Sequence, residues 1–290
     1  MKYDKPNRGG VWPAIIPSYT FKANSFLSLP FLLVPYRSYK MSIPTIQKHS
    51  NDADVVGFTD RHVPTQNWLN TVSEKFTGPK YTISDETTIH GACPFGPMTA
   101  AKNGFVIASK KITYTRADGK EGIVPGVAFL RGNAVAILVI LRVAETGEEH
   151  CVLTVQPRVP VADPNYIEIP AGMMDGSSNF AGKAAAELQE ETGLAINQAS
   201  LRKLGKMVPS AGGCDETIQL YLYKAEVSAE VLDTFKGKAT GVMTENEDIV
   251  LRVEPLKKVR EMTLDETITD AKLTSALYYY DCRGDTSLTT

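Results

Sequence analysis

The chain has 290 residues, of which 43% are hydrophobic and 22% charged, an ordinary composition for a globular protein with a sizeable core. Its formal net charge of -2 excludes a global positive field that would recruit nucleic acid, so an anionic substrate would need local positive groups. No apolar run approaches the ~20 residues that span a bilayer, and no membrane partner is expected. The four cysteines form no C-x-x-C pair, which indicates reduced thiols rather than a zinc site.

The first forty residues differ from the rest in charge. One acid, Asp4, stands against six basic residues: Lys2, Lys5, Arg8, Lys22, Arg37 and Lys40. A basic, acid-poor, Ser-containing segment is typical of a transit peptide, which would send the protein to a plastid or mitochondrion. A disordered tail, or an upstream extension with Met41 as the true start, explains the same composition and would leave the protein cytoplasmic. Residues 1–48 are therefore treated as a basic leader.

Residues 49–126 are expected to form a helix and a β-hairpin that together make a dimerisation region. Apolar residues recur at helical spacing after Pro64, namely Trp68, Leu69, Val72 and Phe76, and Gly78 ends the pattern. Residues 85–103 are rich in Gly and Pro, which predicts a loop. Residues 105–114 predict a strand, and residues 123–130 predict its hairpin partner.

Residues 127–280 are expected to form one domain, followed by a short tail at 281–290. Strands are predicted at 134–143, 151–155, 166–169, 201–208, 217–227 and 249–253, and helices at 178–192, 256–262 and 268–280. Because the first of these strands is almost entirely apolar, we expect it to be buried on both faces. The predicted class is α+β, with a mixed sheet covered by helices.

The segment 170–194, PAGMMDGSSNFAGKAAAELQEETGL, carries the most informative pattern. Ser177 or Ser178 would cap the helix, and Gly193 stands where a left-handed residue ends one. Three carboxylates, Glu187, Glu190 and Glu191, share one helix face at i, i+3 and i+4. They repel one another unless a hard divalent cation binds between them, as Mg²⁺ does in phosphoryl chemistry. Taken alone, the pattern also fits a solvated acidic helix face.

The surroundings of these glutamates resemble the Nudix box, G-x5-E-x7-R-E-U-x-E-E-x-G-U, in which U is apolar. Seven of its nine fixed positions match: Gly172, Glu187, Leu188, Glu190, Glu191, Gly193 and Leu194. Two positions depart, because Ser178 replaces the first Glu and Ala186 replaces the Arg that normally orients a metal-binding Glu. Arginine restored at position 186 is expected to raise kcat, unless another residue, such as Lys183 one turn earlier, already orients the cluster.

The resemblance extends to the ADP-ribose and ADP-sugar diphosphatase branch of this family, and is strongest to its plant ADP-sugar diphosphatases. It covers roughly residues 100–280 through the segments PGVAFLRGNAVAILVIL, VQPRVP, IPAGMMD, PSAGGCDE and ENEDI. The implied fold is the Nudix α/β/α sandwich with a mixed sheet. The implied metal is Mg²⁺, with Mn²⁺ as an alternative, held by Glu187, Glu191, Glu190 and the backbone carbonyl of Ala171.

The same resemblance suggests the other site residues. The catalytic base would be Glu245, from a loop before a late strand, with Glu247 as the alternative, and Glu190 and Glu216 complete the catalytic set. Arg158 resembles the diphosphate-binding arginine of the branch, and its forked guanidinium suits phosphate oxygens. Arg131 is a weaker candidate of the same kind. Glu216 follows a Gly-rich loop and would contact the metal or the attacking water.

The expected activity is Mg²⁺-dependent hydrolysis of a nucleoside diphosphate sugar of the ADP-glucose or ADP-ribose type, by a homodimer. The products would be a nucleoside monophosphate and a sugar phosphate. Two alternatives remain open. One is a Nudix hydrolase of UDP-sugars, GDP-sugars or dinucleotides. The other is a catalytically impaired Nudix protein that binds nucleotide sugars without turnover, which the alanine at position 186 would explain.

Overall fold

The computed structural model describes residues 53–97, 100–101, 103–174, 179–194, 196–241 and 248–283. The chain divides into two units, Met1–Ile46 and Gln47–Thr290, and all of the described residues lie in the second unit. The basic leader expected at residues 1–48 thus lies outside the described residues. None of the described helices is long and apolar enough to cross a membrane.

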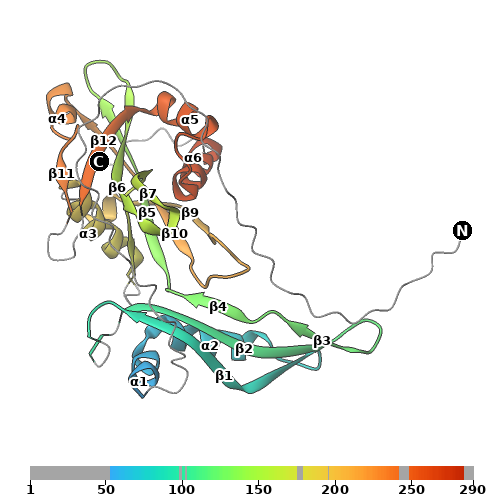
Figure 1. The fold of residues 1–290 in the computed structure, drawn as a ribbon. Helices are drawn as coiled ribbons and strands as arrows, with labels where there is room; N and C mark the ends of the chain where they lie inside the picture. The colour runs from blue at the N-terminus through green and yellow to red at the C-terminus, as the bar shows by residue number, and fades with distance from the viewer. Residues whose placement is uncertain are drawn as a thin grey trace, which may run out of the picture. The chain divides into compact units, whose positions relative to one another are not determined.

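Two helices and a small sheet begin the second unit (Figure 1). They are α1 (Ala53–Arg61), α2 (Val63–Lys75), β1 (Tyr81–Pro94), β2 (Gly104–Thr115), β3 (Glu121–Val124) and β4 (Val127–Leu130). β2 pairs antiparallel with each of the other three strands. Phe58 of α1 and Leu130 of β4 are fully buried in one cluster, against which Trp68 of α2 packs. The predicted helix after Pro64 is confirmed, and so is the predicted hairpin, although its second strand is divided into β3 and β4.

The loop predicted at residues 85–103 is wrong over residues 85–94, because these residues belong to β1. The glycine and proline that suggested a loop occupy places where a strand tolerates them. Gly91 follows a shift in the pairing register with β2, and Pro94 is the last residue of the strand. Among the described strands β1 pairs only with β2, so it lies at the edge of its sheet.

A larger sheet forms the body of the molecule. Its strands are β5 (Ala134–Val143), β6 (Glu149–Arg158), β7 (Asp163–Glu168), β8 (Ala171–Met173), β9 (Arg202–Met207), β10 (Ile218–Val227), β11 (Ala239–Thr240) and β12 (Ile249–Pro255). The order is β11-β12-β6-β5-β10-β9, with β7 paired to β6 and β8 paired to β5. β5 and β10 run parallel and the other described pairs are antiparallel, so the sheet is mixed as predicted.

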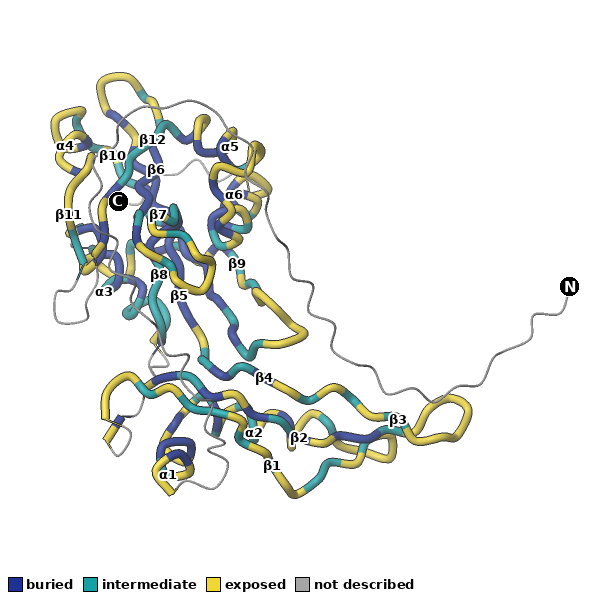
Figure 2. Tube along the Cα trace, in the orientation of Figure 1, coloured by how far each residue is buried: buried dark blue, intermediate teal, exposed yellow. Residues whose placement is uncertain are grey.

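Helices cover both faces of this sheet (Figures 1 and 2). They are α3 (Phe180–Thr192), α4 (Ala229–Asp233), α5 (Leu256–Leu264) and α6 (Ala271–Arg283), with short 3-10 turns at Val159–Val161 and Gln198–Ser200. The side chains of β5 alternate between the two layers. Leu138 packs with residues of α5 and α6, whereas Ile137 packs with residues of α3 and α4. Burial on both faces is thereby confirmed for this strand, and with it the α+β class and the α/β/α sandwich.

The expected start of the second domain, at residue 127, remains a prediction. β4 begins there and pairs with β2 of the small sheet, whereas the first strand of the larger sheet begins at Ala134. At the other end, α6 extends to Arg283, three residues into the tail expected at 281–290.

Candidate functional site

The box spans the short strand β8 and the helix α3. Residues 175–178 lie outside the described residues, and with them both serines expected to cap the helix. The N-cap is Asn179, whose side-chain oxygen accepts a hydrogen bond from the backbone N–H of Gly182 at 3.0 Å. At the other end Gly193 has φ 76°, the left-handed conformation predicted for the residue that ends the helix.

Glu187 lies directly against the box glycine. A Cβ atom built on Gly172 would lie 1.8 Å from the Glu187 Cδ atom, so any larger residue at 172 would displace this carboxylate. The Lys183 Nζ atom, one helical turn earlier, lies 2.7 Å from the Glu187 Oε1 atom. The Glu187 carboxylate is therefore buried, has room only because position 172 is glycine, and faces a cation on its own helix.

Glu191 connects α3 to two other elements. Its Oε2 atom accepts a hydrogen bond from the backbone N–H of Ala171 at 2.9 Å, and its backbone carbonyl accepts one from the Thr240 hydroxyl at 2.5 Å. Only 3% of the residue is exposed. Glu191 therefore joins three parts of the fold, namely β8, the face of α3 that is expected to bind the metal, and the end of β11.

The three helix glutamates differ in their surroundings. Glu187 and Glu191 are buried, whereas Glu190 is exposed, and among the described residues no three acidic, histidine or cysteine side chains are grouped closely enough to hold a metal ion. The residues nevertheless fit a hard cation, because Glu187 and Glu191 are buried one turn apart and Gly172 leaves space for the Glu187 carboxylate.

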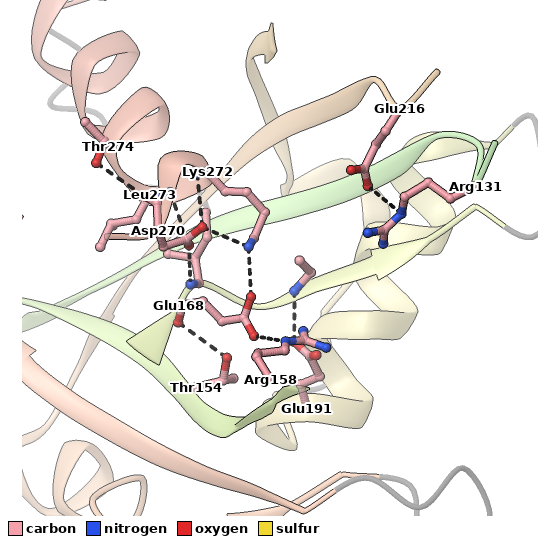
Figure 3. Close-up of polar contacts among 12 residues, drawn as sticks. Arg131, Thr154, Arg158, Glu168, Glu191, Glu216, Asp270, Lys272, Leu273 and Thr274 are labelled. Atoms are coloured by element: carbon pink, nitrogen blue, oxygen red, sulfur yellow. Dashed lines mark hydrogen bonds and ion pairs between the residues drawn. The ribbon is translucent and has the colours of Figure 1, made fainter. Parts of the chain in front are cut away.

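Arg158 lies at the end of β6 and joins a buried ionic cluster (Figure 3). Its Nε atom is 2.6 Å from the Glu168 Oε1 atom, and the other Glu168 oxygen is 2.8 Å from the Lys272 Nζ atom. Lys272 also contacts the carboxylate of Asp270 at 2.8 Å. Glu168 is 3% exposed, but the side chain of Arg158 is 40% exposed, so the cluster runs from the interior to the surface.

Arg131 and Glu216 form a separate pair (Figure 3). The Arg131 Nε atom lies 3.2 Å from the Glu216 Oε1 atom, and the Arg131 guanidinium lies over the Phe105 ring. Burial raises the pKa of Glu216 above its usual value, although the charge of Arg131 acts in the opposite direction. A pocket of about 300 Å³, lined by residues of α2, Arg131 and Met173 among others, adjoins this pair.

The loop that carries Glu216 is fixed to the small sheet. The backbone N–H of Phe129 donates to the carbonyl of Gly213 at 2.7 Å, and Asp215 accepts from the backbone N–H of Arg131 at 2.9 Å. The residues that precede Glu216 are thus bound to β4 and to the connection that follows it. The approach of this loop to the substrate remains a prediction.

Glu245 and Glu247 lie outside the described residues, but both ends of their segment are described. Thr240 of β11 pairs with Ile249 of β12, so the chain leaves and re-enters the sheet at neighbouring positions. Because Thr240 also binds the backbone of Glu191, this segment begins beside α3.

Three members of the ionic cluster were not recognised in the sequence: Glu168, Asp270 and Lys272. Glu168 immediately precedes the IPAG segment, which is a signal that could have drawn attention to it. Asp270 and Lys272 are about a hundred residues from Glu168 in the chain, and no local sequence pattern connects them to Arg158.

A mixed sheet between two helical layers carries the box on β8 and α3, and the chain is similar in sequence to a Nudix hydrolase. Over 155 residues it is 36% identical to Nudix hydrolase 14, chloroplastic, of Arabidopsis thaliana, and the match covers 50% of this chain and 49% of that protein. It is 28% identical over 189 residues to GDP-mannose pyrophosphatase of Klebsiella pneumoniae, a match that covers 63% of this chain and 88% of that protein.

The chain thus spans about half the length of Nudix hydrolase 14. The solved structure of an ADP compounds hydrolase matches 69% of this chain and 97% of its own, with a TM-score of 0.44 and 15% sequence identity. No family model matches the chain.

Proposed function

We propose that this protein hydrolyses the diphosphate bond of a nucleoside diphosphate sugar of the ADP-glucose or ADP-ribose type. The observation that carries the proposal is the short segment from Glu168 to Ala171, which joins a half-exposed arginine to the acidic helix. Glu168 holds Arg158, and Ala171 binds Glu191. One end of this short segment therefore contacts a positive group for phosphate oxygens, and the other end contacts an acidic site for a metal. Hydrolysis of a diphosphate requires both.

The metal would be Mg²⁺, with Mn²⁺ as an alternative, held by Glu187, Glu191, the exposed Glu190 and the Ala171 carbonyl. A bound divalent ion supplies charge neutralisation and lowers the pKa of a bound water. Side chains of the protein bind the phosphate oxygens and accept the proton. Arg158 binds and orients the phosphate oxygens through its fork of N–H donors, with Arg131 as a weaker second group. A carboxylate, for which Glu245 is the first candidate, takes the proton from water.

The products are a nucleoside monophosphate and a sugar phosphate. Adenine is the proposed base because the segments around the box are similar to those of ADP-sugar diphosphatases. One relative is named as a GDP-mannose pyrophosphatase, which favours a GDP-sugar hydrolase as the second candidate. Ala186 in place of the box arginine favours a third, a nucleotide-sugar-binding protein without turnover.

A substrate panel separates these candidates. ADP-glucose, ADP-ribose, UDP-glucose, GDP-mannose and a dinucleotide are each incubated with Mg²⁺, and phosphate is measured after a phosphatase has acted on the products. We expect the highest kcat/KM with an adenine nucleotide sugar. A higher value for GDP-mannose would assign the second candidate, and binding of nucleotide sugar without turnover of any substrate would assign the third.

Arg158→Ala should raise KM by roughly ten- to hundredfold, because hydrogen bonds to charged groups are worth about 1.5–3 kcal/mol. The kcat should also fall if the contact tightens in the transition state. Arg142→Ala is the matched control, since Arg142 is a similarly exposed arginine of the same sheet and pairs with Glu226. Equal kinetics for the two variants would reject the role given to Arg158.

Lys183 is proposed to replace the missing box arginine, because it contacts Glu187 at 2.7 Å. Lys183→Met should lower kcat by about tenfold, the lower end of what groups that orient metal ligands contribute. Ala186→Arg should then recover activity in the Lys183→Met background, while adding little to the unaltered enzyme. A folded Ala186→Arg enzyme with clearly raised kcat would show instead that the acidic pair is under-oriented.

A homodimer and an organellar destination complete the proposal. Ile107, Ile123 and Val127 are exposed apolar residues of the small sheet, the part expected to dimerise, and light scattering of the purified chain tests this. Nudix hydrolase 14 is named as chloroplastic, which supports plastid targeting by residues 1–40. Localisation of a fluorescent fusion, with and without residues 1–40, tests that part.

A further inference from the structure

The ionic cluster behind Arg158 is built from two acids and two bases that differ sharply in exposure. Glu168 and Asp270 are 3% and 2% exposed, and the Lys272 side chain is 16% exposed, whereas that of Arg158 is 40% exposed. Burying charges costs free energy even when they are paired. A cluster that ends at a half-exposed arginine therefore needs an explanation beyond stability.

The buried side chains of the cluster form ion pairs with one another and hydrogen bonds with backbone N–H groups. Asp270 accepts hydrogen bonds from the backbone N–H groups of Ile169 at 3.1 Å and Leu273 at 3.3 Å, and so fixes the start of α6 to the strand end before the box. Lys272 contacts Asp270 and one Glu168 oxygen, each at 2.8 Å. This arrangement leaves the second Glu168 oxygen for Arg158 alone.

Arg158 uses only one of its donors within the described residues. Its Nε–H donates to Glu168, and among those residues its two terminal nitrogens form no further hydrogen bond or ion pair. The Nε–H lies in the plane of the guanidinium, so an acceptor at this atom fixes the direction in which the terminal N–H groups point. A fork that is already oriented loses less rotamer entropy when it binds an anion.

We propose that Glu168 is a positioning residue for substrate binding, and that Lys272 in turn holds Glu168 so that the Arg158 fork is oriented toward the diphosphate. This inference rests on the proposed function, because it takes the diphosphate as the ligand of Arg158. It adds two residues to the site, neither of which touches the substrate.

Glu168 and Lys272 keep their charges near neutral pH. Burial alone would raise the pKa of Glu168, but Lys272 and Arg158 outweigh it, and the pKa lies below its usual value. Burial alone would lower the pKa of Lys272, but Asp270 and Glu168 hold it above its usual value. The salt bridge between Glu168 and Arg158 is therefore present in an assay near neutral pH.

Two variants and one control test the proposal through KM, kcat and the melting temperature, with the nucleotide sugar that the unaltered chain hydrolyses best. In Glu168→Gln an amide offers one oxygen where the carboxylate offered two, so Arg158 and the buried Lys272 compete for it. We expect KM to rise roughly tenfold, as for other groups that orient a ligand-binding residue. The control is Glu254→Gln, because Glu254 bridges Arg252 at 2.7 Å and Lys258 at 2.8 Å at the opposite end of β6.

The double variant Glu168→Leu/Lys272→Met separates positioning from stability. It replaces the buried Glu168–Lys272 pair by apolar groups, which is often neutral for stability. Asp270 loses its contact with Lys272 but keeps three backbone N–H donors, which stabilise its charged form. We expect a melting temperature close to that of the unaltered protein and a KM that stays raised, because Arg158 has lost its acceptor. A KM that returns to normal together with the melting temperature would overturn the inference, as would an unchanged KM in Glu168→Gln. Absence of any turnover by the unaltered chain would overturn the proposed function instead, and the inference with it.

Discussion

Glu191→Gln is expected to lower kcat by at least about a hundredfold, the equivalent of about 2.7 kcal/mol in the activation barrier. A neutral amide is a poor ligand for a hard cation, and Glu191 is one of the two buried carboxylates at the proposed metal site. The fold should survive, because the glutamine side-chain oxygen can still accept the hydrogen bond from the Ala171 N–H. The measurement is turnover over a range of Mg²⁺ concentrations, together with a melting curve.

The neighbouring Glu190 supplies the comparison for this prediction. It belongs to the same turn of α3 but is exposed, so Glu190→Gln should cost less activity than Glu191→Gln. Both variants should melt within about 4 °C of the unaltered protein, a shift that corresponds to about 1 kcal/mol for a chain of this size. A folded Glu191→Gln enzyme with near-normal turnover would show that the acidic face of α3 does not hold the metal.

The sequence predicts the larger sheet well because its strands follow simple rules. β5 is an apolar run broken only by Arg142 and is buried on both faces, and α3 has an apolar stripe between a capping position and Gly193. β1 was missed because an edge strand with a register shift tolerates Gly91 and Pro94, residues that usually mark loops. The loop prediction failed because these two residues usually favour loops, whereas the edge position of this strand accommodates them.

Candidate site residues could be predicted where a contiguous motif carries them, and not where the fold assembles them. Glu187 and Glu191 belong to the box, but the space that Gly172 leaves for Glu187 appears only in three dimensions. Lys183 could be suggested as an orienting group from helical spacing, because i and i+4 share a face. The partnership of Glu168 with Lys272 spans 104 residues, and no periodicity or motif in a single sequence encodes such a contact.

The proposed base comes from the segment between β11 and β12, and the residues that precede this segment are hydrogen-bonded to the acidic helix. The Thr240 hydroxyl donates to the Glu191 carbonyl, and Lys238 donates to the carbonyl of Thr192 at 3.4 Å. Thr240 also pairs with Ile249, so the two described ends of this segment lie side by side in the sheet. Because Thr240 lies beside Glu191, we propose that Glu245, which lies outside the described residues, takes the proton from a water at the proposed metal site.

Glu245→Gln is therefore expected to lower kcat by about 10²–10⁴-fold with little change in KM, since general-base catalysis typically contributes that much. Glu247→Gln, two residues further along the same segment, is the matched control and should cost less. Rates should be measured from acid to neutral pH, because the unaltered enzyme must lose activity as the base becomes protonated, and this acid limb should flatten in Glu245→Gln. If Glu247→Gln is the more damaging variant, the base is Glu247. If both variants keep their rate within about threefold, well below the general-base range, the water is activated by the metal together with the helix glutamates, and the buried Glu216 becomes the next carboxylate to test.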